Sequence, residues 1–379
     1  MNKSVLFQLG RWDVGGVERV TVVVANELVR RGWTVAVSAF EFGNRTMLDD
    51  LDSSVFVCEL KHGWLSSENR RMLAGIIRER KVSVVVNQWC VPYKVTRFLR
   101  KAIAGTEARL VAFHHNQPNL NKRILDARNP LVRRLASIVT AVNLRMVYDN
   151  SDAYVVLSES FVELFRKFIH KTSLEKVCVI PNPLTITSQS SVEKENIVLY
   201  VGRLEETQKR VSRVVEMWRR LCGTNNEWKL VIAGDGPDRR MYENVASGMP
   251  RIEFTGFVDP AQWYAKAKIL VLTSDFEGFG LVLVEAMAAK CVPVALGSYP
   301  AVYDIIKDSC GKVVPTPFNA DGFASEVASL MADERTRTAL AENAYQWSRS
   351  FTVGKVVDRY EALFTKLSAG SCKCAEGVE

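Results

Sequence analysis

The sequence is poor in several features whose absence excludes whole classes of protein. Histidine occurs only four times in 379 residues, and none of the eight cysteines has the paired C-x-x-C spacing of a zinc site. No run of about 18 apolar residues is present, so no transmembrane helix is expected. The N-terminal stretch MNKSVLFQLG lacks the apolar core and cleavage site of a signal peptide, and we therefore expect a cytoplasmic protein.

Acidic residues are also scarce in the first half of the chain compared with basic ones. Residues 1–185 hold 27 Lys and Arg against 17 Asp and Glu, a balance of +10, whereas residues 186–379 hold 23 against 25, a balance of −2. A basic half beside a near-neutral half implies an acidic partner for the first. Nucleic acid, an anionic membrane and a phosphorylated acceptor are the candidates.

Strand-like and helix-like segments alternate along both halves, which predicts parallel sheets covered by helices on both faces. The polar, Ser/Thr-rich stretch Leu184–Glu195 separates the halves and is the expected linker. We therefore predict an α/β protein with two Rossmann-like, doubly wound domains, residues 1–184 and 185–352, facing each other across a cleft. In such sheets, ligands bind at the carboxyl ends of the strands.

The most informative segment is SDFEGFGLVLVEAMAA, residues 274–289. Glu277 stands in a glycine-rich turn directly after the expected strand Ile269–Thr273, and Glu285 stands in the apolar helix that follows. Free backbone N–H groups at a helix start bind anions, while carboxylates accept hydrogen bonds from hydroxyl groups. Phosphate and hydroxyl recognition together indicate a sugar nucleotide, although a glutamate at a helix start is also a common cap.

Other expected strand ends of the second half carry compatible groups. Gly202-Arg203 ends its first strand and Lys209 follows, and two cations there suit a pyrophosphate. Gly234 begins the GDGP loop after the next strand, and Phe257-Val258 follows the third, where backbone groups could hold a base. Each of these two loops can also be a simple turn.

In the first half, Gly15-Gly16 precedes an expected helix and His114-His115 ends the strand Leu110–Phe113. The two glycines allow a substrate to approach the backbone, or form only a tight turn. The stretch is not G-x-G-x-x-G and has no P-loop lysine, which argues against a nicotinamide dehydrogenase. The histidines have no further ligand at metal spacing, and Asp50-Leu51-Asp52 lies in a polar loop, so we expect no metal site.

Two basic amphipathic stretches remain, Asn69–Lys81 and Asn121–Tyr148. Basic residues beside an apolar face are typical of a helix on an anionic membrane, and equally of a surface helix with a solvated face. Aromatic residues do not interleave with the charges, and no RNP, KH or zinc-finger pattern occurs, which disfavours a nucleic-acid-binding protein.

In this order, the motifs VGRL, QKR, GDGP, FTGFV and EGFGLVLVEAMA, preceded by GGVERV and FHHN, resemble the retaining nucleotide-sugar glycosyltransferases of family four, which have the GT-B fold. The resemblance covers nearly the whole chain. It implies that residues 1–184 bind the acceptor and that residues 185–352 bind the nucleotide-sugar donor. It implies a hexosyl- or glycosyltransferase that moves a sugar from a UDP- or GDP-sugar to a lipid-linked or other glycan acceptor in the synthesis of capsule, O-antigen or exopolysaccharide. It implies no metal and no other cofactor, and a place at the inner face of the cell membrane.

The resemblance also assigns roles. Arg203 and Lys209 would hold the diphosphate, Glu277 the donor-sugar hydroxyls and Glu285 the ribose. The remaining contacts would come from Gly15, Gly16, Gly202, Gly234, Phe257, Val258, Gly278, Phe279, Gly280 and Leu281. His115, preferred over His114, would contact the donor sugar. The donor phosphate would act as the base in same-face attack, so no protein nucleophile is expected.

Relatives carry G-G-x-x-E where this chain has SYPAVYD, residues 298–304, which leaves the identity of the sugar open. The resemblance also implies that the helix Val353–Leu367 returns to the first domain and that residues 369–379 form a flexible tail. Three alternatives stay open: another GT-B enzyme, such as a sugar-nucleotide epimerase, a basic nucleic-acid-binding protein, or a partner without activity. A GT-B phosphorylase would want a pyridoxal lysine, which no motif marks.

Overall fold

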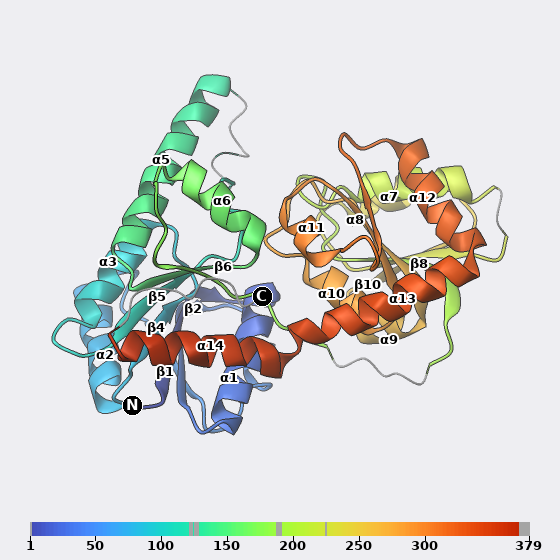
Figure 1. Cartoon of the computed structure of the whole chain (residues 1–379). Helices are drawn as coiled ribbons and strands as arrows, with labels where there is room; N and C mark the ends of the chain where they lie inside the picture. The colour runs from blue at the N-terminus through green and yellow to red at the C-terminus, as the bar shows by residue number, and fades with distance from the viewer. Residues whose placement is uncertain (1, 121–123, 125–128, 187–191, 224–225, 371–379) are drawn as a thin grey trace. The chain divides into compact units, whose positions relative to one another are not determined.

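The fold is given by a computed structural model, which describes residues 2–120, 124, 129–186, 192–223 and 226–370 (Figure 1). The chain divides into two compact units: unit 1 comprises Met1–Pro183 and Val353–Glu379, and unit 2 comprises Leu184–Thr352. Parts of three predicted segments lie outside the described residues: 187–191 of the linker, 371–379 of the tail, and the stretch that holds Lys122, Arg123 and Arg128.

Unit 1 contains a seven-stranded parallel sheet in the order β3-β2-β1-β4-β5-β6-β7. Val5 of β1 pairs with Val35 of β2 on one side and with Val84 of β4 on the other, so the strand order reverses between β1 and β4. The residues of β4 and β6 are all buried, as expected of strands covered on both faces. The strands are β1 (Ser4–Trp12), β2 (Thr34–Phe42), β3 (Phe56–Glu59), β4 (Val84–Asn87), β5 (Arg109–Phe113), β6 (Ala153–Val156) and β7 (Val177–Val179).

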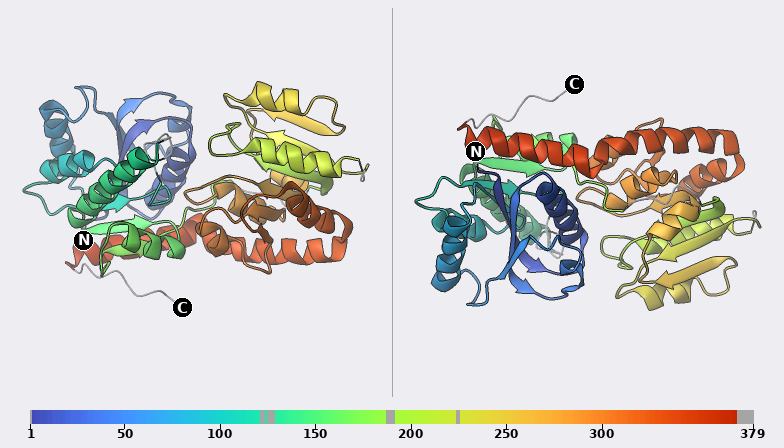
Figure 2. Two further views of the ribbon diagram at one scale, coloured as in Figure 1. Left: turned by 90° about the horizontal axis from the view of Figure 1, so that it is seen from above. Right: turned by 90° about the horizontal axis from the view of Figure 1, so that it is seen from below.

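The last helix of the chain, α14 (Val353–Ser368), packs against α1 (Gly16–Arg30) in unit 1 (Figures 1 and 2). Arg31 Nη1 donates to Asp358 at 2.6 Å and to Glu361 at 2.7 Å, and Trp33 Nε1 donates to Glu361 at 2.7 Å. These contacts join segments more than 300 positions apart in the sequence. Within the described residues, the other helices of unit 1 are α2 (Ser67–Glu79), α3 (Tyr93–Ala102), α5 (Pro130–Asp149), α6 (Glu159–Phe168) and the 3-10 turn Thr46–Leu48.

Unit 2 repeats the same architecture with a six-stranded parallel sheet in the order β10-β9-β8-β11-β12-β13. Its order reverses between β8 and β11, because β8 pairs with β9 on one side and with β11 on the other. The strands are β8 (Glu195–Val201), β9 (Lys229–Ala233), β10 (Ile252–Gly256), β11 (Ala267–Leu272), β12 (Val292–Leu296) and β13 (Lys312–Val314). The helices are α7 (Val211–Leu221), α8 (Arg239–Val245), α9 (Ala261–Lys266), α10 (Leu281–Ala288), α11 (Ala301–Ile305), α12 (Ala320–Ala332), α13 (Glu334–Ser348) and the 3-10 turn Arg349–Phe351.

The prediction of two doubly wound parallel-sheet units is confirmed. The prediction missed β13 and α11, which have three and five residues, because segments of that length show no period. No helix in the described part of the chain is long and apolar enough to cross a membrane.

Candidate functional site

The candidate residues of unit 2 gather at the point where its strand order reverses. Gly202-Arg203 directly follows β8, and the loop that begins at Thr273 directly follows β11, its neighbour in the sheet. Loops after two such strands diverge to opposite faces of a parallel sheet and leave room for a ligand between them. The predicted cations and the predicted carboxylate Glu277 therefore share one edge of the sheet.

Lys209 and Glu277 form a largely buried ion pair at this edge. Lys209 Nζ lies 2.7 Å from Glu277 Oε1, with the two side chains 17% and 9% exposed. Ser274 Oγ donates to the same oxygen at 2.7 Å, and Gln208 Nε2 donates to Oε2 at 3.4 Å. A buried carboxylate needs such partners to remain charged. The structure thus brings together two of the residues predicted for catalysis, and adds Ser274 and Gln208, which sequence reasoning missed.

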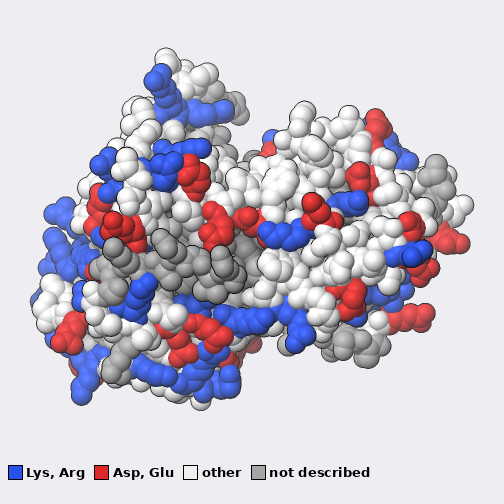
Figure 3. Space-filling model, in the orientation of Figure 1, with Lys and Arg blue, Asp and Glu red and all other residues white. Residues whose placement is uncertain are grey.

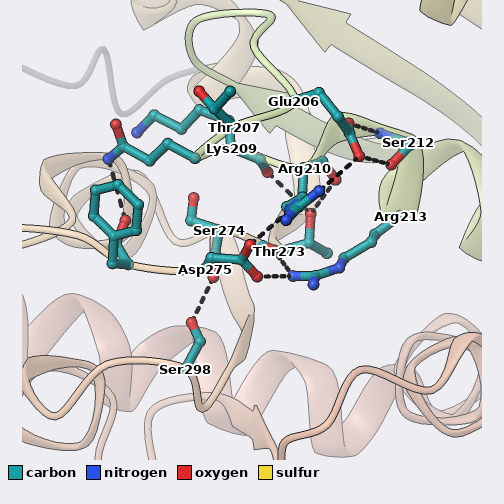
Figure 4. Close-up of polar contacts among 12 residues, drawn as sticks. Glu206, Thr207, Lys209, Arg210, Ser212, Arg213, Thr273, Ser274, Asp275 and Ser298 are labelled. Atoms are coloured by element: carbon teal, nitrogen blue, oxygen red, sulfur yellow. Dashed lines mark hydrogen bonds and ion pairs between the residues drawn. The ribbon is translucent and has the colours of Figure 1, made fainter. Parts of the chain in front are cut away.

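A second set of charges ties the loop after β8 to the loop after β11. Asp275 accepts from Arg210 Nε at 2.6 Å and lies 2.6 Å from Arg213 Nη1 (Figure 4). The backbone adds to this connection, since Asp275 N donates to Gln208 O at 2.9 Å. Hydrogen bonds from charged groups are stronger than neutral ones, so this cluster fixes Lys209 and Glu277 relative to each other. In the sequence, the only indication of this cluster was the presence of Asp275 in the short loop after the expected strand.

Arg203 differs from Lys209 in its exposure. Its side chain is 60% exposed and pairs with Glu205 through Nη2. An exposed guanidinium that follows the same strand end keeps donors that can turn toward an anion. The two predicted diphosphate ligands therefore differ. The Lys209 ammonium is largely buried against Glu277, whereas the Arg203 guanidinium is accessible to a ligand.

Glycines allow the loops at this edge to pack backbone against backbone. A Cβ atom built on Gly234 would lie 1.9 Å from the carbonyl oxygen of Gly202, so any side chain there would push the loops after β8 and β9 apart. Gly234 N also donates to Gly256 O at 2.9 Å. The position predicted for ligand contact at Gly234 has in addition a structural reason to be glycine.

The N-terminus of α10 is shaped by Gly280 and Tyr299. Gly280 has φ +91°, and a Cβ atom there would lie 2.6 Å from the Tyr299 hydroxyl. That hydroxyl is buried and has no hydrogen-bond partner among the described residues. Burial, with a contribution from the nearby Glu277 charge, raises the pKa of Tyr299 well above its ordinary value. Tyr299 belongs to the stretch in which this chain departs from the G-G-x-x-E pattern.

The other predicted residues of this segment divide between backbone and side-chain roles. Gly278 and Leu281 lie in the turn and at the start of α10, whereas the Phe279 ring is buried and packs edge-on against Phe351 with centroids 5.8 Å apart. Only the backbone of Phe279 is therefore available for the predicted contact.

Glu285 lies in α10 and is buried. Thr185 Oγ1 donates to its Oε1 at 2.6 Å, and Tyr264 OH donates to its Oε2 at 2.9 Å. A carboxylate has about four lone-pair sites, so each oxygen retains acceptor capacity. Phe257, predicted beside the base, is 76% exposed directly after β10, and Val258 is half-buried.

In unit 1, the two histidines have different surroundings. His114 is buried, and its Nδ1 lies 2.5 Å from the Tyr154 hydroxyl. His115 is half-buried, stacks on Phe113 with centroids 4.8 Å apart, and bonds through Nε2 to Gln88 Oε1. Since an amide oxygen only accepts, Nε2 carries the proton. His115 Nδ1 is then an acceptor, for which the described part of the chain offers no partner.

Both imidazoles are neutral in this environment. Burial lowers the pKa of His114 to about 4. Burial, together with the repulsion that a protonated His114 would exert, lowers the pKa of His115 to about 3. His114 is a structural residue of the core of unit 1. His115 presents a free lone pair and is the better candidate for contact with a ligand hydroxyl.

The Gly15-Gly16 turn caps α1, with Gly15 in extended conformation at the N-cap. A Cβ atom on Gly15 would lie 2.6 Å from Glu18 Oε2. For metal, the described residues contain no group of three or more His, Cys, Asp or Glu side chains arranged to hold an ion. Asp52 of the D-x-D pattern accepts from Ser54 N at 2.9 Å and from Ser54 Oγ at 2.7 Å.

Two family models match the chain. The model described as Glycosyltransferase Family 4 matches residues 14–187, and the model described as Glycosyl transferases group 1 matches residues 184–347. Together they cover both units.

Curated relatives and solved structures agree with these matches. A Campylobacter jejuni protein, GalNAc-α-(1→4)-GalNAc-α-(1→3)-diNAcBac-PP-undecaprenol α-1,4-N-acetyl-D-galactosaminyltransferase, is 25% identical over 96% of this chain and 99% of its own. The lipopolysaccharide 1,6-galactosyltransferase of Salmonella typhimurium is 30% identical over 43% of this chain and 48% of its own. The Anabaena protein HepE, crystallised with UDP and glucose, superposes with a TM-score of 0.73 at 18% identity, over 96% of this chain and all of its own.

Proposed function

This chain belongs to the family-four glycosyltransferases and has the GT-B fold, and from that premise we propose the reaction that it catalyses. It transfers a sugar from a uridine or guanosine diphosphate sugar to a lipid-linked or other glycan acceptor, with retention of the anomeric configuration. It contributes to the synthesis of a surface polysaccharide, which is a capsule, an O-antigen or an exopolysaccharide. The Campylobacter and Salmonella relatives, whose names specify lipid-linked and lipopolysaccharide acceptors, support the class of acceptor.

The observation that carries the proposal is the Lys209–Glu277 pair beside the accessible Arg203 at the strand-order reversal of unit 2. A nucleotide sugar presents a diphosphate and hydroxyl groups to the same site. Arg203 and Lys209 bind the diphosphate and stabilise the charge that develops on it as the glycosidic bond breaks. Glu277 accepts hydrogen bonds from the donor-sugar hydroxyls, and Lys209 holds its carboxylate in place.

The rest of the donor extends along the same sheet edge. Glu285 accepts from the ribose hydroxyls, while Phe257 and Val258 flank the base. Backbone groups of Gly202, Gly234 and residues 278–281 line the phosphates, and the Gly15-Gly16 turn contributes further backbone groups to the donor. His115 Nδ1 accepts from a donor-sugar hydroxyl. The leaving phosphate takes the proton of the acceptor, so no side chain serves as nucleophile and no metal is required.

A thermal-shift screen against UDP, GDP, ADP and their common sugars, with and without EDTA, tests the proposal. A ligand at 100 times its dissociation constant adds about 2.7 kcal/mol to the free energy of unfolding. We expect one nucleotide and its sugars to raise the melting temperature, with no effect of EDTA. The anomeric configuration of the product, read by NMR, is expected to match the donor. No shift with any nucleotide, or a shift only with RNA or DNA, would contradict the proposal.

We also propose peripheral contact with an anionic membrane through α5. Its face carries seven exposed apolar side chains, Leu131 being 75% exposed: Leu131, Val132, Leu135, Ile138, Val139, Val142 and Met146. Lys and Arg side chains lie around the end of this helix, beside uncharged surface (Figure 3). An apolar helix face flanked by cations suits an anionic bilayer surface.

The second basic stretch, Asn69–Lys81, does not share this property. It forms most of α2, whose apolar residues Leu73 and Ile77 are buried in the core of unit 1. Its cations therefore lie on a solvated face, and we restrict the membrane proposal to α5.

A further inference from the structure

Unit 1 contains a cavity that none of the predicted site residues lines. Its wall includes Gln88, which bonds His115, and Glu18 at the start of α1, beside Gly15. Its volume is about 770 Å³, and its walls come from the carboxyl-end halves of β1 and β2, the loop after β3 and the loop after β4. It thus lies beside the reversal of strand order between β1 and β4, the place where doubly wound sheets bind ligands. The volume is within the range of cavities that enclose ligands of the size of a di- or trisaccharide.

The cavity is lined by tryptophans that are exposed. Trp64 is 44% and Trp89 is 39% exposed, and their ring centroids are 5.7 Å apart. The large tryptophans of the two cores, Trp12 and Trp218, are by contrast fully buried. Exposing indole rings to water is unfavourable, so two of them side by side in one cavity indicate a ligand that covers them.

Both rings are held in fixed positions. The ammonium group of Lys94 lies 3.7 Å from the centroid of the Trp64 ring, and Phe40 packs against the same ring edge-on. The loop before Trp64 is tied down by buried Asn69, whose Nδ2 donates to Leu60 O at 2.9 Å and to Gly63 O at 2.6 Å. A preformed aromatic surface loses little conformational entropy when it binds.

Trp89 is fixed by a glycine. Its ring lies so close to the backbone of β1 that a Cβ atom on Gly10 would be 2.3 Å from Trp89 Cε3. The position of this ring therefore depends on the absence of a side chain at residue 10. Trp89 N also donates to Asn87 Oδ1 at 3.2 Å, which orients the start of the loop.

Charged side chains of both signs surround the aromatic surface. Arg11 and Lys61 are balanced by Glu18 and Glu41, and Arg11 Nη1 lies 3.3 Å from Glu41 Oε1. Because these charges cancel, no excess of positive charge attracts a phosphate or another anion, and the charged side chains disfavour a purely apolar ligand. A neutral pyranose matches both features, because its ring presents C–H groups on one face and hydroxyls along its edge.

We propose that Trp64 and Trp89 form a binding subsite for a neutral sugar ring of the acceptor glycan, on which the indole rings stack while Glu18, Glu41 and Arg11 bond its hydroxyls. This inference rests on the proposed glycosyltransferase function and adds the chemical class of the acceptor unit: an uncharged hexose or N-acetylhexosamine. The two tryptophans select for sugars with a flat C–H face.

Saturation-transfer NMR on the full chain tests the subsite, with maltose, lactose and N,N′-diacetylchitobiose as probes and UMP as competitor. We expect the wild-type chain to give transfer signals with at least one of the three disaccharides, unaffected by UMP. Trp64→Ala and Trp89→Ala should each reduce the signals at least fivefold. Gly10→Ala should reduce them as well although both tryptophans remain, because the added methyl group displaces Trp89. Met72→Ala, an exposed apolar residue on α2 outside the cavity, is the matched control.

The nucleotide-induced thermal shift of each variant is measured beside these signals. A variant that keeps this shift is folded and retains its donor site, so the loss of disaccharide signal then belongs to the subsite. No disaccharide signal from the wild type, equal signals from wild type and both tryptophan variants, or displacement of the disaccharide by UMP would overturn the inference. Absence of any nucleotide shift in the wild type would instead count against the proposed function.

Discussion

Glu277 has two tasks that compete for one carboxylate. In this structure its Oε1 is bound by Lys209 and Ser274, and Gln208 bonds its other oxygen. In the proposed reaction, Glu277 also accepts hydrogen bonds from the donor-sugar hydroxyls, and Lys209 also binds the diphosphate. Because both side chains are largely buried, each is the main counter-charge of the other before the donor arrives.

We expect Glu277→Gln to reduce kcat/KM at least 100-fold, since the lost charge removes both a hydroxyl acceptor and the anchor of Lys209. The variant should also lose about 1–3 kcal/mol of stability, because the Lys209 ammonium is left without its partner. The double variant Glu277→Gln/Lys209→Met should recover the melting temperature and remain inactive. Initial rates and thermal melts check both parts, with Glu342→Gln, which breaks an exposed ion pair to Lys290, as control. Wild-type turnover in the single variant would remove the assigned role.

A second prediction for a single residue concerns the contribution of Tyr299 to the free energy of unfolding. Its buried hydroxyl has no hydrogen-bond partner among the described residues, so folding removes it from water without compensation. Tyr299→Phe keeps the buried ring, removes the hydroxyl that lies beside Gly280, and should raise the free energy of unfolding by about 1 kcal/mol. Urea denaturation of the two proteins measures the difference. A fall in stability would mean that the hydroxyl is bonded in solution.

Whole elements were easier to predict from the sequence than their contacts. Strand β11 is a largely apolar segment, and its predicted range, Ile269–Thr273, lies within two residues of the observed one. The turn at Gly278–Gly280 and the cations after β8 were found because strand, loop and helix follow one another in the chain. Asp275, Gln208 and Tyr299 were not, because their partners come from other loops and depend on how strands are ordered in the sheet.

For a single element, we predict the effect of substitutions in α5 on membrane binding. Arg133→Glu/Arg134→Glu should reduce binding to vesicles that contain phosphatidylglycerol by about 10- to 100-fold, since each basic residue near an anionic surface contributes about 1 kcal/mol. Leu131→Ser/Leu135→Ser should reduce binding to these vesicles as well, through the loss of exposed apolar area. Vesicle co-sedimentation measures both. Arg70→Glu/Arg71→Glu on α2 is the matched control and should bind almost normally. Equal binding by all three variants would exclude α5 as the contact surface.

At the scale of the molecule, the chain consists of two units with separate hydrophobic cores. The predicted donor ligands Arg203, Lys209, Glu277 and Glu285 belong to unit 2, whereas both histidines of the FHHN motif belong to unit 1. Two-state unfolding is not expected of such a chain. Conditions that act on one unit should therefore shift one transition and spare the other.

Acid should act on unit 1 through His114. Its pKa in the folded chain is about 4, below the ordinary value of 6.5, so the unfolded chain binds the proton more tightly. Above pH 6.5 this residue does not reduce the free energy of unfolding. As the pH falls from 6.5 toward 4, it lowers the free energy of unfolding by at most about 3 kcal/mol. His115, with a pKa of about 3 in the folded chain, adds a loss of the same sign over this range. His114→Gln should therefore reduce the dependence between pH 6.5 and 4, and the part that remains belongs to His115.

Calorimetry of the full chain at pH 7 and pH 5, with and without the nucleotide that binds, tests the two expectations together. We expect two transitions, of which one falls in temperature at pH 5 and the other rises with nucleotide. His114→Gln should reduce the acid shift and leave the nucleotide shift unchanged, whereas Glu277→Gln/Lys209→Met should weaken only the nucleotide shift. A single transition that responds to both acid and nucleotide would show that the units unfold as one, and that the donor site of unit 2 is coupled to the core of unit 1.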